Sequence, residues 1–264
     1  MEKSLALYAV FGKPIGHSLS PIMHNRAFLA QGIAAHYLPV ECHPSELVDK
    51  LGAFLRLGGR GANLTRPLKE EILPFLAEKD AWVETAGAAN TLCWTGTGWA
   101  GRNTDCLALD RLLAANNVAP GDALILGGGG VARATAAVLH RHQLSVVVAA
   151  RRPRAVSWAD SVVAWDERLL PHPWRVVVNA TPLGQIGEPQ ELAWPLPAEG
   201  GLAVEWVYRP RRTRFVQLAE ARNIAVVDGL TLLVEQAAMG WLAWFGCEGP
   251  REVMWEAIRP WLQE

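Results

Sequence analysis

DALILGGGGVARATAAVLHRH, residues 122–142, joins an apolar run to a helical pattern through four consecutive glycines. SVVVAARRP, residues 145–153, then supplies a second apolar run. A strand, a glycine turn, a helix and a second strand in this order predict a βαβ unit with two parallel strands. This stretch decides the fold, because parallel strands joined by a crossover helix build an α/β architecture.

The glycine turn carries a dinucleotide-binding pattern. Gly127, Gly129 and Ala132 form G-x-G-x-x-A directly after a strand and before a helix, the context that gives this motif its specificity. Small residues let the backbone approach a pyrophosphate at the helix N-terminus, where free N–H groups favour negative charge. A tight turn that binds no ligand is the alternative interpretation.

The end of the second strand carries arginines where an NAD site places an acidic residue. Residues 149–154 read Ala-Ala-Arg-Arg-Pro-Arg. The guanidinium groups of Arg151, Arg152 and Arg154 can bind a 2′-phosphate through charge-assisted hydrogen bonds. We therefore expect NADP rather than NAD, with an exposed basic loop as the alternative.

Short apolar runs alternate with helical patterns on both sides of this unit, which predicts an α/β fold with mainly parallel sheets. The 264 residues exceed the size at which single cores usually stop growing, so we expect two domains. The first comprises residues 1–105 and 237–264, and a Rossmann-type nucleotide-binding domain comprises residues 106–236. Further strands are expected at 7–12, 36–41, 62–64, 175–179, 203–208 and 225–227. Further helices are expected at 45–57, 105–116, 230–245 and 251–262, from Pro67, and after Ser20 as the N-cap.

Composition and charge narrow the classes of function. Lys and Arg number 25 against 26 Asp and Glu, so the overall charge gives no attraction to nucleic acid or to an anionic membrane. Four scattered cysteines without a C-x-x-C pair predict reduced thiols and no metal site. The N-terminus has too short an apolar run for a signal peptide or a membrane helix. We therefore expect a cytoplasmic protein with a small-molecule partner.

Three segments of the first half concentrate small polar residues at expected strand-to-helix junctions, where α/β sheets collect their ligands. They are HSLSP at 17–21, NLTRPLK at 63–69, and NT at 90–91 with NTD at 103–105. We expect one crevice lined by Ser18, Ser20, Asn63, Thr65 and Asn90, whose uncharged donors and acceptors suit a polyhydroxylated ligand. Any one of them alone is more typical of a cap or a turn than of a ligand-binding residue.

Lys69 lies in the first turn of its expected helix, the end at which the helix dipole disfavours a cation. Asp105 begins another helix after a glycine-rich turn and can supply the compensating carboxylate. A lysine held by an aspartate can move a proton to a forming alkoxide, as a ketone reduction requires. A structural salt bridge explains the pair equally well at this point.

The chain resembles the shikimate dehydrogenase family over nearly its whole length. The resemblance rests on eight stretches in the family's order: GKPIGHSLSPIMHN (12–25), GANLTRPLK (61–69), AGAANTL (86–92), GRNTD (101–105), GGGGVARA (127–134), NATPLG (179–184), WVYRP (206–210) and GLTLLVEQAA (229–238). It implies NADPH-linked, reversible reduction of 3-dehydroshikimate to shikimate in a cleft between a substrate domain and a Rossmann domain. Lys69 and Asp105 would be the catalytic pair.

The resemblance also implies the remaining site residues. Ligands of the substrate would be Ser18, Ser20, Asn63, Thr65, Lys69, Asn90, Asp105, Tyr208 and Gln236. Residues lining the nucleotide would be Gly127, Gly128, Gly129, Gly130, Val131, Ala132, Ala150, Arg151, Arg152, Arg154, Thr181, Val207 and Gly229.

The chain departs from the family pattern at four places. Ala150-Arg151-Arg152 replaces the usual Asn-Arg-Thr of the 2′-phosphate loop. Cys106 stands where glycine usually follows the catalytic aspartate, and Ala89 and Glu205 replace the usual Val and Asp. The alternatives are a relative that acts on quinate or an aminated analogue, and an NADP-binding sensor without catalysis. Retention of both Lys69 and Asp105 argues against a sensor. We expect a monomer or a homodimer.

Overall fold

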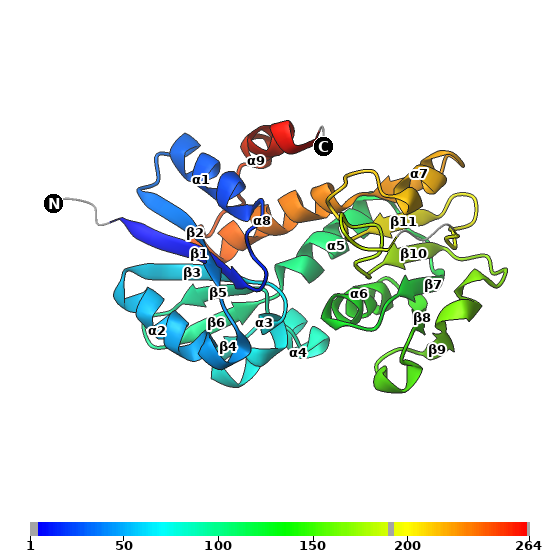
Figure 1. Cartoon of the computed structure of the whole chain (residues 1–264), viewed down its shortest axis with the longest axis horizontal. Coiled ribbons are helices and arrows are strands. Elements are labelled where there is room, and N and C mark those ends of the chain that lie inside the picture. Colours follow the sequence, from blue (N-terminus) through cyan, green and yellow to red (C-terminus); the bar gives the residue numbers. More distant parts are fainter. Residues whose placement is uncertain (1–4, 190–192, 263–264) are drawn as a thin grey trace. The chain divides into compact units, whose positions relative to one another are not determined.

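A computed structural model describes residues 5–189 and 193–262 of the chain (Figure 1). It divides into two compact units. The first contains the described residues up to Asp105 and those from Val234 onward, and the second is Cys106–Leu233. The chain thus returns to the first unit at Val234, three residues before the expected position.

The first unit is built on a six-stranded sheet in the order β2-β1-β3-β5-β6-β4. β1 pairs in parallel with β2 and β3, and β4 pairs in parallel with β6, whereas β5 runs antiparallel to β3 and β6. The strands are β1 (Ala6–Gly12), β2 (Ala35–Glu41), β3 (Gly59–Leu64), β4 (Leu76–Lys79), β5 (Thr91–Trp94) and β6 (Trp99–Arg102).

Helices pack on this sheet around a core that includes Phe11, Leu68 and Leu92, all almost wholly buried. The helices within the unit are α1 (Ser20–Ala30), α2 (Leu47–Arg56), α3 (Leu68–Glu71), α4 (Ala81–Ala86) and α9 (Arg251–Ile258). Two longer helices belong to both units along the chain, α5 (Thr104–Ala115) and α8 (Gly229–Phe245). Short 3-10 turns cover Pro44–Glu46, Leu73–Phe75 and Arg259–Leu262.

The second unit contains a fully parallel six-stranded sheet in the order β12-β11-β10-β7-β8-β9. Its strands are β7 (Gly121–Leu126), β8 (Leu144–Ala150), β9 (Ser161–Ala164), β10 (Val176–Asn179), β11 (Leu202–Glu205) and β12 (Ala225–Val227). Counted from β7, this is the doubly wound order 3-2-1-4-5-6, whose direction reverses between β7 and β10. α6 (Gly130–Arg141) packs on β7 and β8, and α7 (Arg214–Glu220) packs on β11 and β12. The expected α/β class with mainly parallel strands is confirmed.

Some expected boundaries are wrong for identifiable reasons. Ser20 is the first residue of α1 and not its cap, because Leu19 occupies that position without a side-chain hydrogen bond. The strand expected at 203–208 ends at Glu205, because the Val207 N–H donates to the Glu205 side chain instead of a neighbouring strand. Tyr208 therefore lies in the following loop. β4, β9 and α4 were not expected, since each is only four to six residues long.

Candidate active site

The segments that follow β1 and β3 lie side by side at the carboxyl end of the first sheet. The Thr65 N–H donates to the Phe11 carbonyl at 2.9 Å, and the Lys13 N–H donates to the Arg66 carbonyl at 3.0 Å. A Cβ at Gly12 would lie 2.2 Å from Thr65 Cγ2, so this approach requires glycine. The geometry brings Thr65 next to the loop that leads into α1.

Ser18 lies in that loop, close to Ser20 at the start of α1. Ser18 Oγ accepts from the Ser20 N–H at 3.3 Å. Ser18 is half-buried and Ser20 is 8% exposed, so both hydroxyls lie at the edge of the core and not on an open surface. Thr65 is likewise half-buried. Three hydroxyl side chains therefore follow the strands β1 and β3, as the sequence predicts.

Lys69 and Asp105 form a direct ion pair. Lys69 Nζ lies 2.7 Å from Asp105 Oδ2, and their side chains are 18% and 11% exposed. Lys69 is on the short helix α3, while Asp105 is in the first turn of α5, where the helix dipole stabilises a carboxylate. The Ala89 N–H donates to the Lys69 carbonyl at 2.8 Å, which fixes α3 to the segment before β5. The pair is largely shielded from water, but both side chains keep some exposed surface that a ligand can contact.

Asn90 is oriented by three donors. Its Oδ1 accepts from the Thr104 N–H at 2.7 Å and from the hydroxyls of Thr104 and Thr91 at 3.1 Å each. The amide oxygen is therefore fully engaged within the chain. What the side chain can offer a ligand is its NH₂ group, a donor suited to a hydroxyl or a carboxylate.

Asn63 was expected to face a ligand, but the structure engages it with the chain. Its Nδ2 donates to the Asn90 carbonyl at 3.2 Å and to Thr91 Oγ1 at 2.9 Å, while its Oδ1 accepts from Tyr37 Oη at 2.6 Å. Asn63 is 7% exposed. Both amide protons are used internally, so this residue acts on the site by holding the backbone of Asn90.

Sequence reasoning missed Tyr37, Thr91 and Thr104 as parts of this network. The paired Asn-Thr at 90–91 and at 103–104 is the signal that could have found the two threonines. Tyr37 gave none, because its partner Asn63 is 26 residues away.

α8 brings Gln236 toward the polar residues around Asn90 and Thr91. A Cβ at Gly240 would lie 4.0 Å from Thr91 Cγ2, and Gln236 is one turn earlier on the same face of the helix. Trp241, the residue after Gly240, donates from Nε1 to His24 Nδ1 at 3.1 Å. Burial lowers the pKa of His24 to about 3, so this histidine is neutral and packs against Tyr37 with ring centroids 4.4 Å apart. His24 thus has a structural role.

The glycine turn of the second unit lies at the point where its strand order reverses. Gly127 has φ of 106°, and a Cβ there would lie 3.0 Å from Thr181 Cγ2 and 3.1 Å from the Ala180 carbonyl oxygen. α6 begins at Gly130 with Gly129 as its cap, and no side chain bonds to the cap. The first N–H groups of the helix therefore donate to no cap side chain and can donate to an anion. Val131 is half-buried, and Ala132 is wholly buried against the sheet.

The arginine loop starts where β8 ends, at Ala150. A Cβ at Gly128 would lie 3.6 Å from Ala150 Cβ and 2.7 Å from Val156 Cγ2, so the glycine turn packs against this loop. Three exposed side chains in this loop form no hydrogen bond or ion pair with the described part of the chain: those of Arg151, Arg152 and Arg154. They are available to a phosphate.

Thr181, Val207 and Gly229 follow the carboxyl ends of β10, β11 and β12. A Cβ at Gly229 would lie 2.3 Å from the Val207 carbonyl oxygen and 2.8 Å from the Tyr208 nitrogen, so only glycine fits there. Val207 is buried, while Thr181 and Tyr208 are half-buried. Together with the glycine turn, these residues place small side chains and closely packed backbone after the carboxyl ends of β7, β10, β11 and β12.

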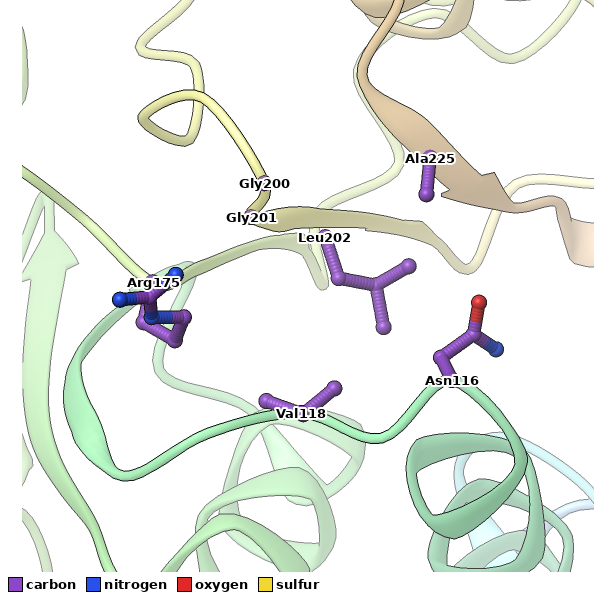
Figure 2. A pocket seen from close by; sticks show the side chains of 7 residues that line it. All are labelled: Asn116, Val118, Arg175, Gly200, Gly201, Leu202 and Ala225. Atoms are coloured by element: carbon purple, nitrogen blue, oxygen red, sulfur yellow. The ribbon is translucent and has the colours of Figure 1, made fainter.

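A separate small pocket lies at the amino ends of the same strands (Figure 2). Figure 2 shows the apolar side chains of Leu202 and Val118 between Arg175 and Asn116. Strands of a parallel sheet bind ligands beyond their carboxyl ends, so this pocket is not a candidate for the reaction. Among the described residues, no cluster of three or more metal-ligating side chains occurs, and no helix is long and apolar enough to cross a membrane.

Comparison with known proteins extends this picture. Residues 10–92 match the family described as the shikimate dehydrogenase substrate binding domain. The chain is 35% identical over 278 residues to the shikimate dehydrogenase (NADP(+)) of Microcystis aeruginosa strain NIES-843, covering 96% of each chain.

Two solved structures show the same architecture. The shikimate 5-dehydrogenase of Thermus thermophilus in complex with NADP(H) and shikimate is 34% identical with a TM-score of 0.86, and the alignment covers 97% of this chain and 99% of that one. The quinate dehydrogenase of Corynebacterium glutamicum in complex with NAD is 28% identical with a TM-score of 0.85, at 97% and 99% coverage.

Proposed function

The chain belongs to the shikimate dehydrogenase family, and from that premise we propose that it reduces 3-dehydroshikimate to shikimate reversibly with NADPH. It is an oxidoreductase with a small-molecule substrate and NADP as cofactor. The observation that carries the proposal is the Lys69–Asp105 pair, 2.7 Å apart, beside the oriented amide of Asn90. An ion pair of purely structural use would not need this set of neighbouring polar groups.

Proton handling falls to Lys69. Reduction of the ketone places a hydride on the carbonyl carbon and a proton on its oxygen, and NADPH supplies the hydride when it is bound. Lys69 donates the proton to the oxygen, and in the reverse direction it accepts the proton from the alcohol. Asp105 keeps the ammonium group in place and stabilises its charge.

Uncharged groups of the first unit hold the ring. Hydroxyls of Ser18, Ser20 and Thr65 and the amides of Asn90 and Gln236 match the hydroxyls and carboxylate of a shikimate-like acid. Asn63 supports Asn90 from behind. By the family match, Tyr208 is a further proposed ligand of the substrate.

The nucleotide occupies the second unit. The N–H groups at the start of α6 receive the pyrophosphate, and small residues of the turn let it approach. Arg151, Arg152 and Arg154 bind the 2′-phosphate, in the absence of the acidic residue that NAD sites use. Thr181, Val207 and Gly229 line the remaining half of the cofactor.

The test is an assay of the purified protein for shikimate-dependent reduction of NADP⁺, followed by nicotinamide absorbance. We expect kcat/KM for shikimate with NADP⁺ to exceed that for quinate and that for NAD⁺. No activity with any shikimate-like acid would overturn the proposal. The structural likeness to an NAD-bound quinate dehydrogenase makes quinate the second candidate, and a higher kcat/KM with quinate would favour it.

A further inference from the structure

We propose that Glu205 is a positioning residue for the nucleotide, whose buried carboxylate fixes the two segments 179–183 and 205–208 against the nicotinamide half of the cofactor. The inference rests on the proposed function in taking NADP as the ligand. The sheet order gives the location. The arginine loop at β8 lies on one side of β7, and β10 and β11 lie on the other. If the 2′-phosphate binds on the β8 side, the nicotinamide half extends over β10 and β11.

Glu205 is the last residue of β11 and is wholly buried. Its Oε1 accepts from the Val207 N–H at 2.8 Å and from Asn179 Nδ2 at 2.9 Å. Its Oε2 accepts from Thr213 Oγ1 at 2.7 Å and from Asn179 Nδ2 at 3.1 Å. All three partners are donors, so the site is built for an acceptor-only carboxylate.

The donors cannot simply reverse direction. Asn179 Oδ1 accepts from the Thr181 N–H at 3.1 Å and from Thr181 Oγ1 at 2.6 Å, so its NH₂ group must face Glu205. Thr213 Oγ1 accepts from the Val216 N–H at 3.3 Å, which leaves its own proton for Glu205. The carboxylate therefore sets the orientation of Thr181 through Asn179.

Two cofactor-lining segments thus depend on one side chain. Through Asn179, Glu205 fixes Thr181, which lies 3.0 Å from the position of a Cβ on Gly127. Through the Val207 N–H, it fixes the backbone that Gly229 approaches so closely. Glu205 itself has no exposed surface, so it acts through these residues and not on the substrate.

The experiment compares Glu205→Gln with Glu205→Asp. Glutamine keeps the shape but turns one acceptor into a donor that faces donors, whereas aspartate keeps the carboxylate and shortens it. We expect Glu205→Gln to raise the Kd for NADPH about tenfold, and Glu205→Asp to raise it less, by isothermal titration. If Glu205 only filled space, the order would be reversed, with glutamine close to wild type.

Two further measurements distinguish a specific effect on cofactor binding from a general disturbance of the protein structure. In Glu205→Gln the KM for shikimate should rise by a clearly smaller factor than the Kd for NADPH, because Tyr208 is the one proposed substrate ligand in a segment that Glu205 fixes. The Kd values for NADPH and NADH should rise by the same factor, because the network is remote from the 2′-phosphate. An equal rise in shikimate KM, or an effect on NADPH alone, would refute the proposal.

Leu144→Ala is the matched control. Leu144 is buried at the amino end of β8, away from the network, so its loss lowers stability without changing the Kd for NADPH. If Leu144→Ala raised that Kd as Glu205→Gln does, loss of stability would explain both and the proposal would fall. The proposed function fails differently, as loss of turnover with shikimate in the wild-type protein itself.

Discussion

Lys69 is the residue on which the proposed chemistry depends most directly. We expect Lys69→Ala to lower kcat by at least roughly a hundredfold, the contribution typical of a positioned acid–base group. The Kd for NADPH should change little, because Lys69 belongs to the first unit. Steady-state kinetics with shikimate and NADP⁺, together with titration of NADPH, measure both quantities.

Lys50 offers the control for that experiment. It also pairs with a carboxylate, Glu46 at 3.0 Å, but on an exposed helix surface. Lys50→Ala should leave kcat unchanged, since exposed ion pairs contribute little. A near-normal kcat in Lys69→Ala would show that the buried pair is structural.

Arg151 should decide the choice of cofactor. Arg151→Ala removes a guanidinium that the described part of the chain leaves without a partner, so we expect a larger rise in Kd for NADPH than for NADH. Titration with both cofactors gives the two ratios. Arg212, which is exposed but bound to Glu220, is the control that should alter neither. Equal effects of Arg151→Ala on both cofactors would mean that this side chain does not bind the 2′-phosphate.

The shifted pKa of Glu205 also predicts that the stability of the protein depends on pH. Burial raises the pKa of this carboxyl to about 7 from 4.5, although its hydrogen bonds lower it. Between these values the folded protein binds the proton more tightly than the unfolded chain. The free energy of unfolding contributed by Glu205 therefore falls as pH rises through this window, by at most about 1.4 kcal/mol per pH unit. Urea unfolding of wild type and Glu205→Gln at pH 5 and pH 7.5 measures the difference. A difference that is independent of pH would contradict it.

At the scale of elements, sequence reasoning works best for long apolar segments. β7, α6 and β8 follow from one stretch because alternation, glycines and helical spacing all agree there. β4 and β9 could not be predicted, because a strand of four residues is too short to show a clear alternation of apolar and polar residues. The end of β11 could not be predicted either, because the buried Glu205 side chain accepts from the Val207 N–H, and its position depends on Asn179, which is 26 residues away in sequence.

In the candidate site, too, local sequence predicts some features, while others depend on tertiary contacts. Local motifs predict the glycine turn and the polar segments after β1 and β3. They could not predict that Asn63 turns toward Tyr37, because that direct contact between β2 and β3 spans the strand β1 that lies between them. Residue type and spacing thus predict which segments carry the candidate site, while the direction of each side chain depends on the tertiary packing.

The start of α8 is the element boundary most sensitive to substitution. In Gly229→Ala the new Cβ would lie 2.3 Å from the Val207 carbonyl oxygen and 2.5 Å from its carbon, and backbone atoms cannot rotate away. We expect lower thermal stability and a higher Kd for NADPH, measured by calorimetry and titration. Gly52→Ala within α2 meets only the flexible end of Arg56 at 3.6 Å, and should be neutral or stabilising by about 0.5–1 kcal/mol. A wild-type Kd in Gly229→Ala would contradict the assignment.

At the scale of the whole molecule, each unit carries a buried polar network behind residues that we propose to face its ligand. In the first unit Tyr37 holds Asn63, which holds Asn90. In the second unit Glu205 holds Asn179, which holds Thr181. The two networks share no hydrogen-bond partner in the described residues, so each should govern its own ligand.

This separation predicts additive effects. Tyr37→Phe removes the hydroxyl that donates to Asn63, so the KM for shikimate should rise while the Kd for NADPH stays constant, the reverse of Glu205→Gln. Each loss in kcat/KM is converted into a free energy. The loss in the double variant Tyr37→Phe/Glu205→Gln should equal the sum of the losses in the two single variants to within about 0.5 kcal/mol, as for independent sites. Kinetics on the four proteins of the cycle give the coupling energy. A coupling above about 1 kcal/mol would mean that the networks act as one unit, because groups without shared partners have no direct means of influencing each other.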